Sequence, residues 1–346
     1  MLLAREKISA LGAIERLVAM QAQLARPPYV GLWSRVHGFK RDDLTALFTS
    51  RKAVRGTLLR ATLHVMSAKD YTRFRAAVQP ALSAGAQAVL RDRMKGFDVD
   101  AVAAAAREFF GKGPTGFEPV RQHLVKKFPK GDDRAMGYVA RLHIPLLQVP
   151  DASRWGYPSA SDFTLAEKWL GTKISTDESS DELVLRYLAA YGPASVSDAQ
   201  TWSGLAKLRD AFERLRPKLV TFRDERGREL FDLPKAPRPD PETAAPVRFL
   251  PEFDHILLAH DDRTRVVADA HRKQVYLPGL RVAATLLVDG VVAGAWSVES
   301  KKALTTLVVQ PFGKLSKAAR DAATEEGEAL AKFLEPDAHD VAVRFA

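Results

Sequence analysis

Residues 181–233 carry the pattern that most restricts the fold available to this chain of 346 residues. Apolar residues recur at helical spacing in three successive segments: 181–191, 195–202 and 205–215. Two short apolar runs follow, at 219–222 and 229–233, and a polar stretch with Gly227 at its turn joins them. Three helices followed by a two-stranded hairpin form the outline of a winged helix, so we expect one winged-helix module here.

Two related sets of helices and paired strands are predicted in the first half of the chain. The earlier copy has a predicted helix at 41–50, strands at 53–59 and 61–66, and a helix that Ser67 caps and that runs toward Leu82. The later copy has predicted helices at 99–110, 117–128 and 132–143, a strand at 144–149, and a wing that returns over 154–163. The sequence therefore predicts three winged-helix modules in tandem.

The sequence changes character after residue 233. Residues 234–246 hold five prolines and no apolar period, which predicts an extended linker. Strands at 282–288 and 291–298 flank Asp289-Gly290, a strong hairpin signal. The remaining predicted elements are a strand at 303–309, a helix at 314–334 and a strand at 341–345. Together they predict a β-barrel-like domain with one helix.

The predicted fold class is therefore α+β, with three tandem winged-helix modules followed by a C-terminal β-barrel-like domain. The length leaves ample chain for several hydrophobic cores. The predicted divisions are 1–95, 96–175 and 176–233 for the modules, 234–246 for the linker and 247–346 for the last domain.

Charge and cysteine content narrow the possible functions. Residues 1–95 hold 17 Lys and Arg against 6 Asp and Glu, a net +11, whereas the remainder holds 35 against 36, a net −1. A basic field confined to one region is typical of a polyanion binder, whereas a surface that serves solubility would spread its charge. The chain has no cysteine, which excludes disulfides and thiolate chemistry. With no long apolar run, we expect a cytoplasmic protein without membrane contact.

A pair of glutamines, Gln21 and Gln23, lies in the basic region. Spacing predicts a helix from residue 13 that stops near residue 25, because two prolines follow. Gln21 falls on the apolar face, where an unpaired amide costs about 1–3 kcal/mol. Residues two apart point to nearly opposite sides of a helix, so both amides reach one cavity only if the helix end unwinds. A core glutamine beside a surface glutamine is the alternative.

Several motifs together resemble the winged-helix DNA glycosylases of the AlkZ and YcaQ type. The matching segments are Gln21-Ala22-Gln23, residues 60–64 (RATLH), 249–254 (FLPEFD), His260 with 262–265 (DRTR), 287–290 (LVDG) and 293–296 (AGAW). The resemblance covers nearly the whole chain in the right order. It implies tandem winged helices, a C-terminal β-barrel and excision of alkylated bases, with Gln21 and Gln23 as the catalytic residues. Ala22 is the smallest residue for the aliphatic middle position of that motif.

The implied chemistry suits neutral amides. A guanine alkylated at N7 is cationic and leaves readily, so the strong general acid of ordinary glycoside cleavage is unnecessary. An amide oxygen can hold the attacking water and face the developing positive charge on the sugar. We therefore expect a monofunctional DNA glycosylase acting on cationic N-alkylated purines, including bulky adducts and crosslinks. It would need no metal, no cofactor and no lyase lysine.

Other residues are candidates for contacts with double-stranded DNA. Arg51, Lys52, Arg55 and Arg60 crowd the first strand pair, and His64 is either a core histidine or a contact to the DNA backbone. Arg263 and Arg265 would touch phosphates or the minor groove, unless they belong to a solvated salt-bridged loop. The histidines and aspartates at 254–262 fit no zinc spacing.

Two other functions stay open at this point. One is a DNA-binding regulator without chemistry, and the other is a catalytically silent binder of damaged DNA. Regulators usually dimerise and carry one winged helix per chain. Three copies followed by a further domain favour a glycosylase that works as a monomer.

Overall fold

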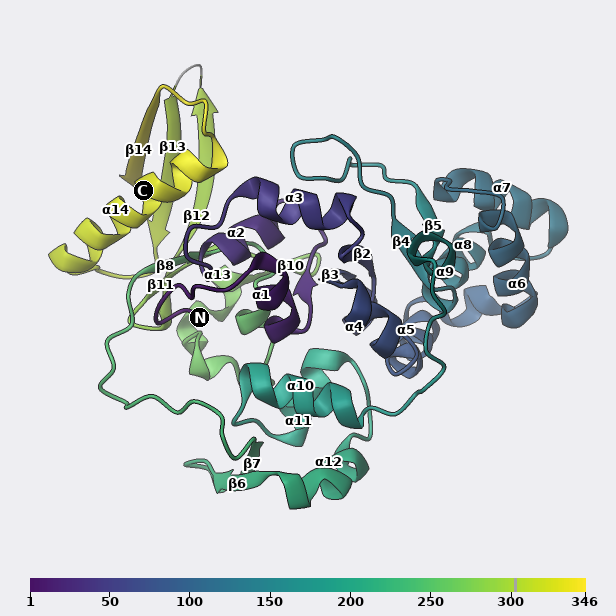
Figure 1. The fold of residues 1–346 in the computed structure, drawn as a ribbon, viewed down its shortest axis with the longest axis horizontal. Helices are drawn as coiled ribbons and strands as arrows, with labels where there is room; N and C mark the ends of the chain where they lie inside the picture. Colours follow the sequence, from purple (N-terminus) through teal and green to yellow (C-terminus); the bar gives the residue numbers. More distant parts are fainter. Residues whose placement is uncertain (302–303) are drawn as a thin grey trace. The chain divides into compact units, whose positions relative to one another are not determined.

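The computed structural model describes residues 1–301 and 304–346. They form two compact units, which we name by their place in the chain. The terminal unit comprises Met1–Ala13, Arg26–Asp43 and Pro237–Ala346, and the central unit comprises Ile14–Ala25 and Leu44–Ala236. Both units combine helices with β-sheet, which confirms the predicted α+β class (Figure 1).

The helix predicted over residues 13–25 is confirmed as far as Leu17, and its continuation to residue 25 is wrong. Helix α1 (Ala10–Leu17) ends where Val18 takes a left-handed backbone conformation with φ 67°, and strand β1 (Met20–Gln21) follows. The two prolines, expected to stop a helix, instead begin helix α2 (Pro27–Trp33). Proline is favourable in a first helical turn, because the N–H that it lacks would have no helical partner there.

One five-stranded sheet runs through the central unit in the order β1-β3-β2-β4-β5. The strands after β1 are β2 (Ala53–Thr57), β3 (Leu63–Ser67), β4 (Leu146–Gln148) and β5 (Phe163–Leu165). All neighbours are antiparallel, and Gly56 of β2 pairs with Leu147 of β4. A Cβ atom on Gly56 would lie 2.9 Å from the carbonyl oxygen of Leu146, so this junction requires glycine. The strands predicted for the first two modules thus share one sheet.

Helices of the central unit follow the predicted order, with one interruption. Ser67 caps helix α4 (Ala68–Phe74), as expected, and its Oγ accepts a hydrogen bond from the Asp70 N–H at 3.1 Å. The predicted continuation toward Leu82 is broken, and α5 (Gln79–Leu90) is a separate helix with a proline in its first turn. The other helices up to residue 170 are α3 (Arg41–Thr49), α6 (Val99–Phe110), α7 (Phe117–Lys127), α8 (Asp133–His143) and α9 (Ala166–Leu170).

Helices α6, α7 and α8 pack together beside β4 and β5 (Figure 1). Phe110, Leu124 and Val139 are fully buried in this cluster. Leu146 and Leu165 join it from the sheet, so the core is continuous from the helices to the strands.

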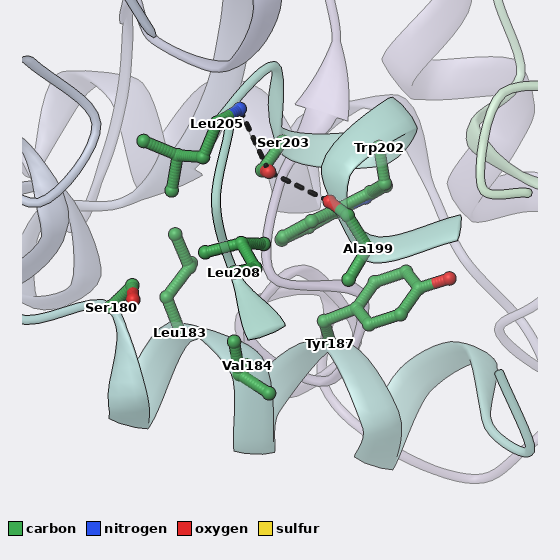
Figure 2. A pocket seen from close by; sticks show the side chains of 9 residues that line it. All are labelled: Ser180, Leu183, Val184, Tyr187, Ala199, Trp202, Ser203, Leu205 and Leu208. Atoms are coloured by element: carbon green, nitrogen blue, oxygen red, sulfur yellow. Dashed lines mark hydrogen bonds between the residues drawn. The ribbon is translucent and has the colours of Figure 1, made fainter. Parts of the chain in front are cut away.

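The third predicted copy appears with its elements in the expected order. They are α10 (Asp181–Tyr191), α11 (Val196–Ser203), α12 (Arg209–Leu215), β6 (Val220–Arg223) and β7 (Glu229–Asp232). Ser195 and Asp198 form a capping box at the start of α11. Figure 2 shows Tyr187 of α10 and Trp202 of α11 facing one another, with ring centroids 5.0 Å apart. The space between these helices is apolar core.

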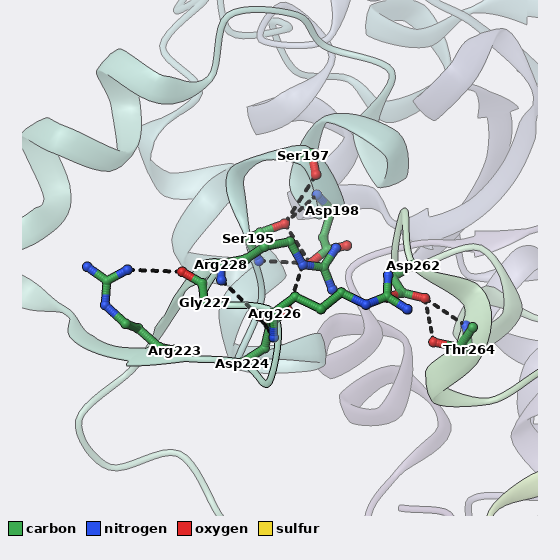
Figure 3. A network of polar contacts seen from close by, with 10 residues as sticks. All are labelled: Ser195, Ser197, Asp198, Arg223, Asp224, Arg226, Gly227, Arg228, Asp262 and Thr264. Atoms are coloured by element: carbon green, nitrogen blue, oxygen red, sulfur yellow. Dashed lines mark hydrogen bonds and ion pairs between the residues drawn. The ribbon is translucent and has the colours of Figure 1, made fainter.

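A tight turn joins β6 to β7 in the predicted wing. Asp224 accepts hydrogen bonds from the backbone N–H groups of Arg226 and Arg228 at 2.9 and 2.8 Å. The Arg223 guanidinium donates to the carbonyl oxygen of Gly227 at 2.9 Å (Figure 3). Gly227 has φ 75°, which explains the glycine at this position.

The terminal unit is built on a second five-stranded sheet, in the order β14-β13-β12-β11-β8. Its strands are β8 (Arg248–Leu250), β11 (Thr285–Val288), β12 (Val291–Lys301), β13 (Leu304–Pro311) and β14 (Asp340–Phe345). Helix α14 (Lys317–Leu334) packs on it, and Gly327 allows Phe249 and Val343 to approach closely. In the described chain this sheet is open, so the predicted barrel is not confirmed.

The hairpin predicted around Asp289-Gly290 is confirmed by the pairing of β11 with β12. The strand predicted from residue 303 begins at Leu304, and residue 303 lies outside the described residues. Short elements fill the segment between β8 and β11: α13 (Arg272–Val275), β9 (Tyr276–Leu277) and β10 (Arg281–Val282). In the same unit, the Arg35 guanidinium makes a buried bidentate ion pair with Asp254, at 3.0 and 2.8 Å.

Candidate functional site

The Gln21-Ala22-Gln23 segment lies at the edge of the central sheet. Gln21 pairs with His64 of β3, and the Ala22 N–H donates to the carbonyl oxygen of Leu63 at 2.7 Å. The Leu63 N–H donates a hydrogen bond to the Gln23 Oε1 at 3.1 Å. The Gln23 side chain thus takes the place of a backbone carbonyl group in the pairing with β3. The two amides are thus fixed by strand pairing rather than by an unwound helix end.

Gln21 is a buried polar residue with a charged partner. Its Oε1 accepts a hydrogen bond from the Arg60 guanidinium at 2.8 Å. Arg60 also donates to the carbonyl oxygen of Trp202 in α11. Arg60 and Ala61 both have left-handed backbone angles, with φ of 51° and 57°, in the short link between β2 and β3. Strained backbone of this kind persists only where surrounding contacts fix it, and here the bond to Gln21 is one of those contacts.

Arg55 holds the backbone of the Gln21-Ala22-Gln23 segment. Its Nε donates to the carbonyl oxygen of Ala22 at 2.9 Å, and its Nη2 donates to that of Gln23 at 3.3 Å. The guanidinium also lies 5.0 Å from the ring centroid of Tyr157. The residue is 4% exposed, so Arg55 is an internal clamp rather than an arginine on an open surface.

A cavity of about 750 Å³ opens beside Gln23. Its walls come from the end of β1, the sheet, the start of α7, α8 and the loop between β4 and β5. The lining residues are Gln23, Leu24, Ala25, Arg55, Leu63, Gly116, Phe117, Glu118, Arg141, Gln148, Tyr157, Pro158, Ser159, Ala160, Ser161, Asp162 and Phe163. A volume of this size lies within the range of ligand-binding pockets.

Gln21 does not line this cavity. Its partner His64 pairs in turn with Gly56 of β2, so these residues form one row across the sheet. Arg55 lies in the next row, and side chains of adjacent rows point to opposite faces. The structure therefore brings Gln23 and Arg55 to the cavity and places Gln21, with Arg60, behind the sheet edge.

The remaining sequence-predicted residues lie elsewhere. Arg51 is exposed, and its guanidinium stacks 4.2 Å from the Trp169 ring centroid. Lys52 beside it is also exposed. His64 is buried, and its Nδ1 lies 3.0 Å from the carbonyl oxygen of Thr62, so it fits the expectation of a core histidine.

Arg263 and Arg265 belong to the terminal unit. Asp262 caps their short helical turn by accepting from the Thr264 N–H at 3.0 Å. The Arg263 guanidinium donates to the carbonyl oxygen of Leu257 and lies 5.4 Å from the Tyr276 ring. Within residues 1–301 and 304–346, no group of three or more His, Asp or Glu side chains could hold a metal ion. In the same residues no helix is long and apolar enough to span a membrane.

Sequence reasoning missed the carboxylates Glu118 and Asp162 of the cavity wall. It also missed Arg141 and Gln148. Both sit on elements whose apolar residues gave the stronger signal, α8 and β4. Burial lowers the pKa of Arg141 from its usual value, and Tyr138 opposes this effect. The one sequence signal for Gln148 is that a glutamine ends a three-residue strand that is otherwise apolar. This signal points to the cavity only when the place of the strand in the sheet is known.

Comparisons with known proteins identify the family and the fold. The model of the AlkZ-like DNA glycosylases matches residues 14–333, and the chain belongs to this family. A solved structure of the Streptomyces sahachiroi DNA glycosylase AlkZ superposes with a TM-score of 0.82 at 21% identity. The match covers 100% of this chain and 95% of that one, and it establishes the shared fold.

A curated relative from Streptomyces sahachiroi is described as an interstrand DNA cross-link repair glycosylase. It is 31% identical to this chain over 150 residues. The matched region spans 41% of this chain and 39% of the relative.

Proposed function

We propose that this protein is a monofunctional DNA glycosylase that hydrolyses the N-glycosidic bond of cationic N-alkylated purines in double-stranded DNA, as a step of DNA repair. The observation that carries the proposal is the cavity of about 750 Å³ with the Gln23 amide at its wall. Family membership supports the class of reaction. The curated relative's repair of cross-links supports extending the substrates to bulky adducts and crosslinks.

Gln23 is the residue that we propose to hold the attacking water. The Leu63 N–H fixes the orientation of its Oε1, and an sp² oxygen has a second lone pair with which to accept a hydrogen bond from water. The same amide dipole faces the sugar as positive charge develops there. Because the cationic base departs as a neutral molecule, the site needs no carboxylic acid to protonate it.

Gln21 contributes to the site without lining the cavity. It anchors Arg60 and hence the strained link that ends at Leu63, whose N–H orients Gln23. We propose that Gln21 acts as a positioning residue through Arg60. A monofunctional mechanism fits the cavity, since no lysine is among the described residues that line it.

The finer architecture is also part of the proposal. We propose that α10 to β7 and the two preceding groups of elements act as three winged-helix modules on DNA. The basic first quarter of the chain supplies the field for the phosphates. The open sheet with α14 would stand where the barrel-like domain was expected, and the protein would act as a monomer.

The test uses a duplex that contains a single N7-methylguanine. After incubation, heat and alkali cleave the strand at abasic sites, and the expected result is one product at the position of the lesion. The same lesion-containing duplex without protein is the control, because heat and alkali alone release some N7-methylguanine, and an unmodified duplex is the second control. Binding without cleavage on methylated, bulky and crosslinked substrates would refute the enzyme and favour the regulator or the damage binder, which sequence-selective affinity would separate.

A further inference from the structure

Gln148 stands on the wall of the cavity with an unsatisfied polar atom. The residue is 8% exposed at the end of β4, and it lines the cavity. Its Oε1 is fully buried and has no hydrogen-bond partner among the described residues. Buried amide oxygens are nearly always paired in native proteins, because leaving one unpaired is costly. On a cavity wall, such an oxygen is a place where a bound molecule can complete the pairing.

Two arginines of the cavity wall, Arg55 and Arg141, lie near Gln148. The register that pairs Gly56 with Leu147 sets Arg55 opposite Gln148, but the Arg55 guanidinium already binds the carbonyl groups of Ala22 and Gln23. Arg141 is the second cation of the cavity. Its guanidinium lies 5.9 Å from the ring of Phe163.

Phe163 is also the residue that pairs with Gln148 across β4 and β5. The Arg141 Nε makes one long contact, 3.5 Å, to the hydroxyl oxygen of Thr57. Gln148 and Arg141 therefore flank one aromatic side chain, with an amide oxygen and a guanidinium on the same wall.

We propose that Gln148 and Arg141 read the Watson–Crick edge of a guanine in this cavity and so select alkylated guanine over alkylated adenine. Guanine presents the N1–H and N2–H donors, which the Gln148 Oε1 accepts, and the O6 acceptor, to which Arg141 donates. Adenine presents an amino donor where guanine has O6, and Arg141 has no acceptor to offer it. The inference rests on the proposed function, since it assigns the reading of the base at the same site.

The test compares Gln148→Met with the wild type on N7-methylguanine and N3-methyladenine in otherwise identical duplexes. Methionine keeps the length of the side chain and removes its hydrogen bonds. We expect excision of methylguanine to fall about 10- to 100-fold while excision of methyladenine stays within about threefold, since a lost base contact affects only the base that made it. The melting temperature should stay level or rise, because the unpaired buried oxygen is gone.

Gln79→Met is the matched control. Gln79 is a partly buried glutamine of α5 whose Oε1 accepts from Arg75 and whose Nε2 donates to Ser83, and it does not line the cavity. It should lower the melting temperature and leave the ratio of the two excision rates unchanged. An equal loss on both bases with Gln148→Met, or an unchanged ratio, would overturn the reading role.

A binding experiment separates this inference from the proposed function. Duplexes with a 2′-fluoro N7-methylguanosine resist cleavage and report affinity alone. If the wild type cleaves nothing but binds this duplex more tightly than the unmodified one, and Gln148→Met loses that difference, the glycosylase fails and the reading role stands. Equal affinity of the wild type for both duplexes, together with no cleavage, would overturn both.

Discussion

Replacing Gln23 by alanine gives the sharpest test of the proposed chemistry. The side chain is exposed, and its one hydrogen bond to described protein atoms is the one from the Leu63 N–H. Losing a neutral, solvent-accessible hydrogen bond costs about 0.5–1.5 kcal/mol. Excision, in contrast, should fall by at least about a hundredfold, because a misplaced nucleophile alone has an effect of that size.

Gln23→Asn refines the test. The asparagine keeps the amide but withdraws it by one methylene, so it can satisfy either the Leu63 N–H or the water, and not both. We expect excision to fall nearly as far as with alanine, while binding to duplex DNA stays within about twofold. Near-normal excision by Gln23→Asn would mean that the amide does not need its present position.

Gln21→Ala should behave differently because its partner is a charge. Arg60 is partly buried and would lose one of its acceptors, at a cost of about 1.5–3 kcal/mol for a hydrogen bond to a charged group. In a compact unit of roughly 200 residues, about 2–4 °C of melting temperature corresponds to each kcal/mol. The expected shift is therefore about 3–12 °C, accompanied by a loss of excision.

Single-turnover excision of N7-methylguanine, thermal melts and DNA titrations on the same preparations separate these cases. The exposed glutamine of α5, Gln87, provides a control variant, Gln87→Ala, that should change none of the three. Wild-type rates in both Gln23→Ala and Gln21→Ala would refute the assignment of the reaction to this segment. Rates that simply follow the folded fraction would assign both residues a structural role.

Two further predictions concern the basic surface and the terminal unit. Affinity for duplex DNA should fall roughly a hundredfold between 50 and 200 mM salt if about four phosphates are contacted. The double variant Arg51→Glu, Lys52→Glu should make the affinity less dependent on salt, to the same extent for all DNA sequences. An affinity that does not change with salt would contradict the electrostatic argument. Asp254→Asn should destabilise the fold by about 3–5 kcal/mol in urea titrations, because it leaves the buried Arg35 charge unpaired. Burial would raise the pKa of Asp254, but Arg35 and His255 outweigh this effect and lower the pKa. The wild type should therefore lose this stability as the pH falls below about 3.9, the pKa of the carboxyl in the unfolded chain. Asp254→Asn should lack that acid transition.

Much of the secondary structure could be read from periodicity alone. Helices α6 and α10 have the predicted bounds, because an uninterrupted apolar face and a clear stop signal define them locally. The hairpin at Asp289-Gly290 was equally local. At these places the local signal and the tertiary packing favour the same structure.

The segment of the candidate site was the least predictable part. Residues 13–25 have helical spacing, yet the chain leaves the helix at Val18 and pairs β1 with β3. That pairing is with residues more than 40 positions away, and no local pattern reports it. The sharing of one sheet by β2 and β4 is non-local in the same way, and it is what places Gln148 on the cavity wall.

The distribution of charge around the cavity has a consequence for the proposed reaction. Arg55 and Arg60 donate hydrogen bonds to carbonyl and amide oxygens, and the cavity wall also carries the carboxylates of Glu118 and Asp162. A cationic base bound in the cavity would therefore meet both the Arg141 guanidinium and these carboxylates.

In the transition state the positive charge moves from the base to the sugar, and the departing base becomes neutral. Cations on the base side of the cavity, such as Arg141, are then relieved of repulsion, while the Gln23 dipole on the sugar side gains attraction. Both changes favour the transition state over the bound substrate. An uncharged lesion offers no such relief, so the same geometry that excises an N7-alkylguanine should leave a neutral, O6-alkylated guanine in place.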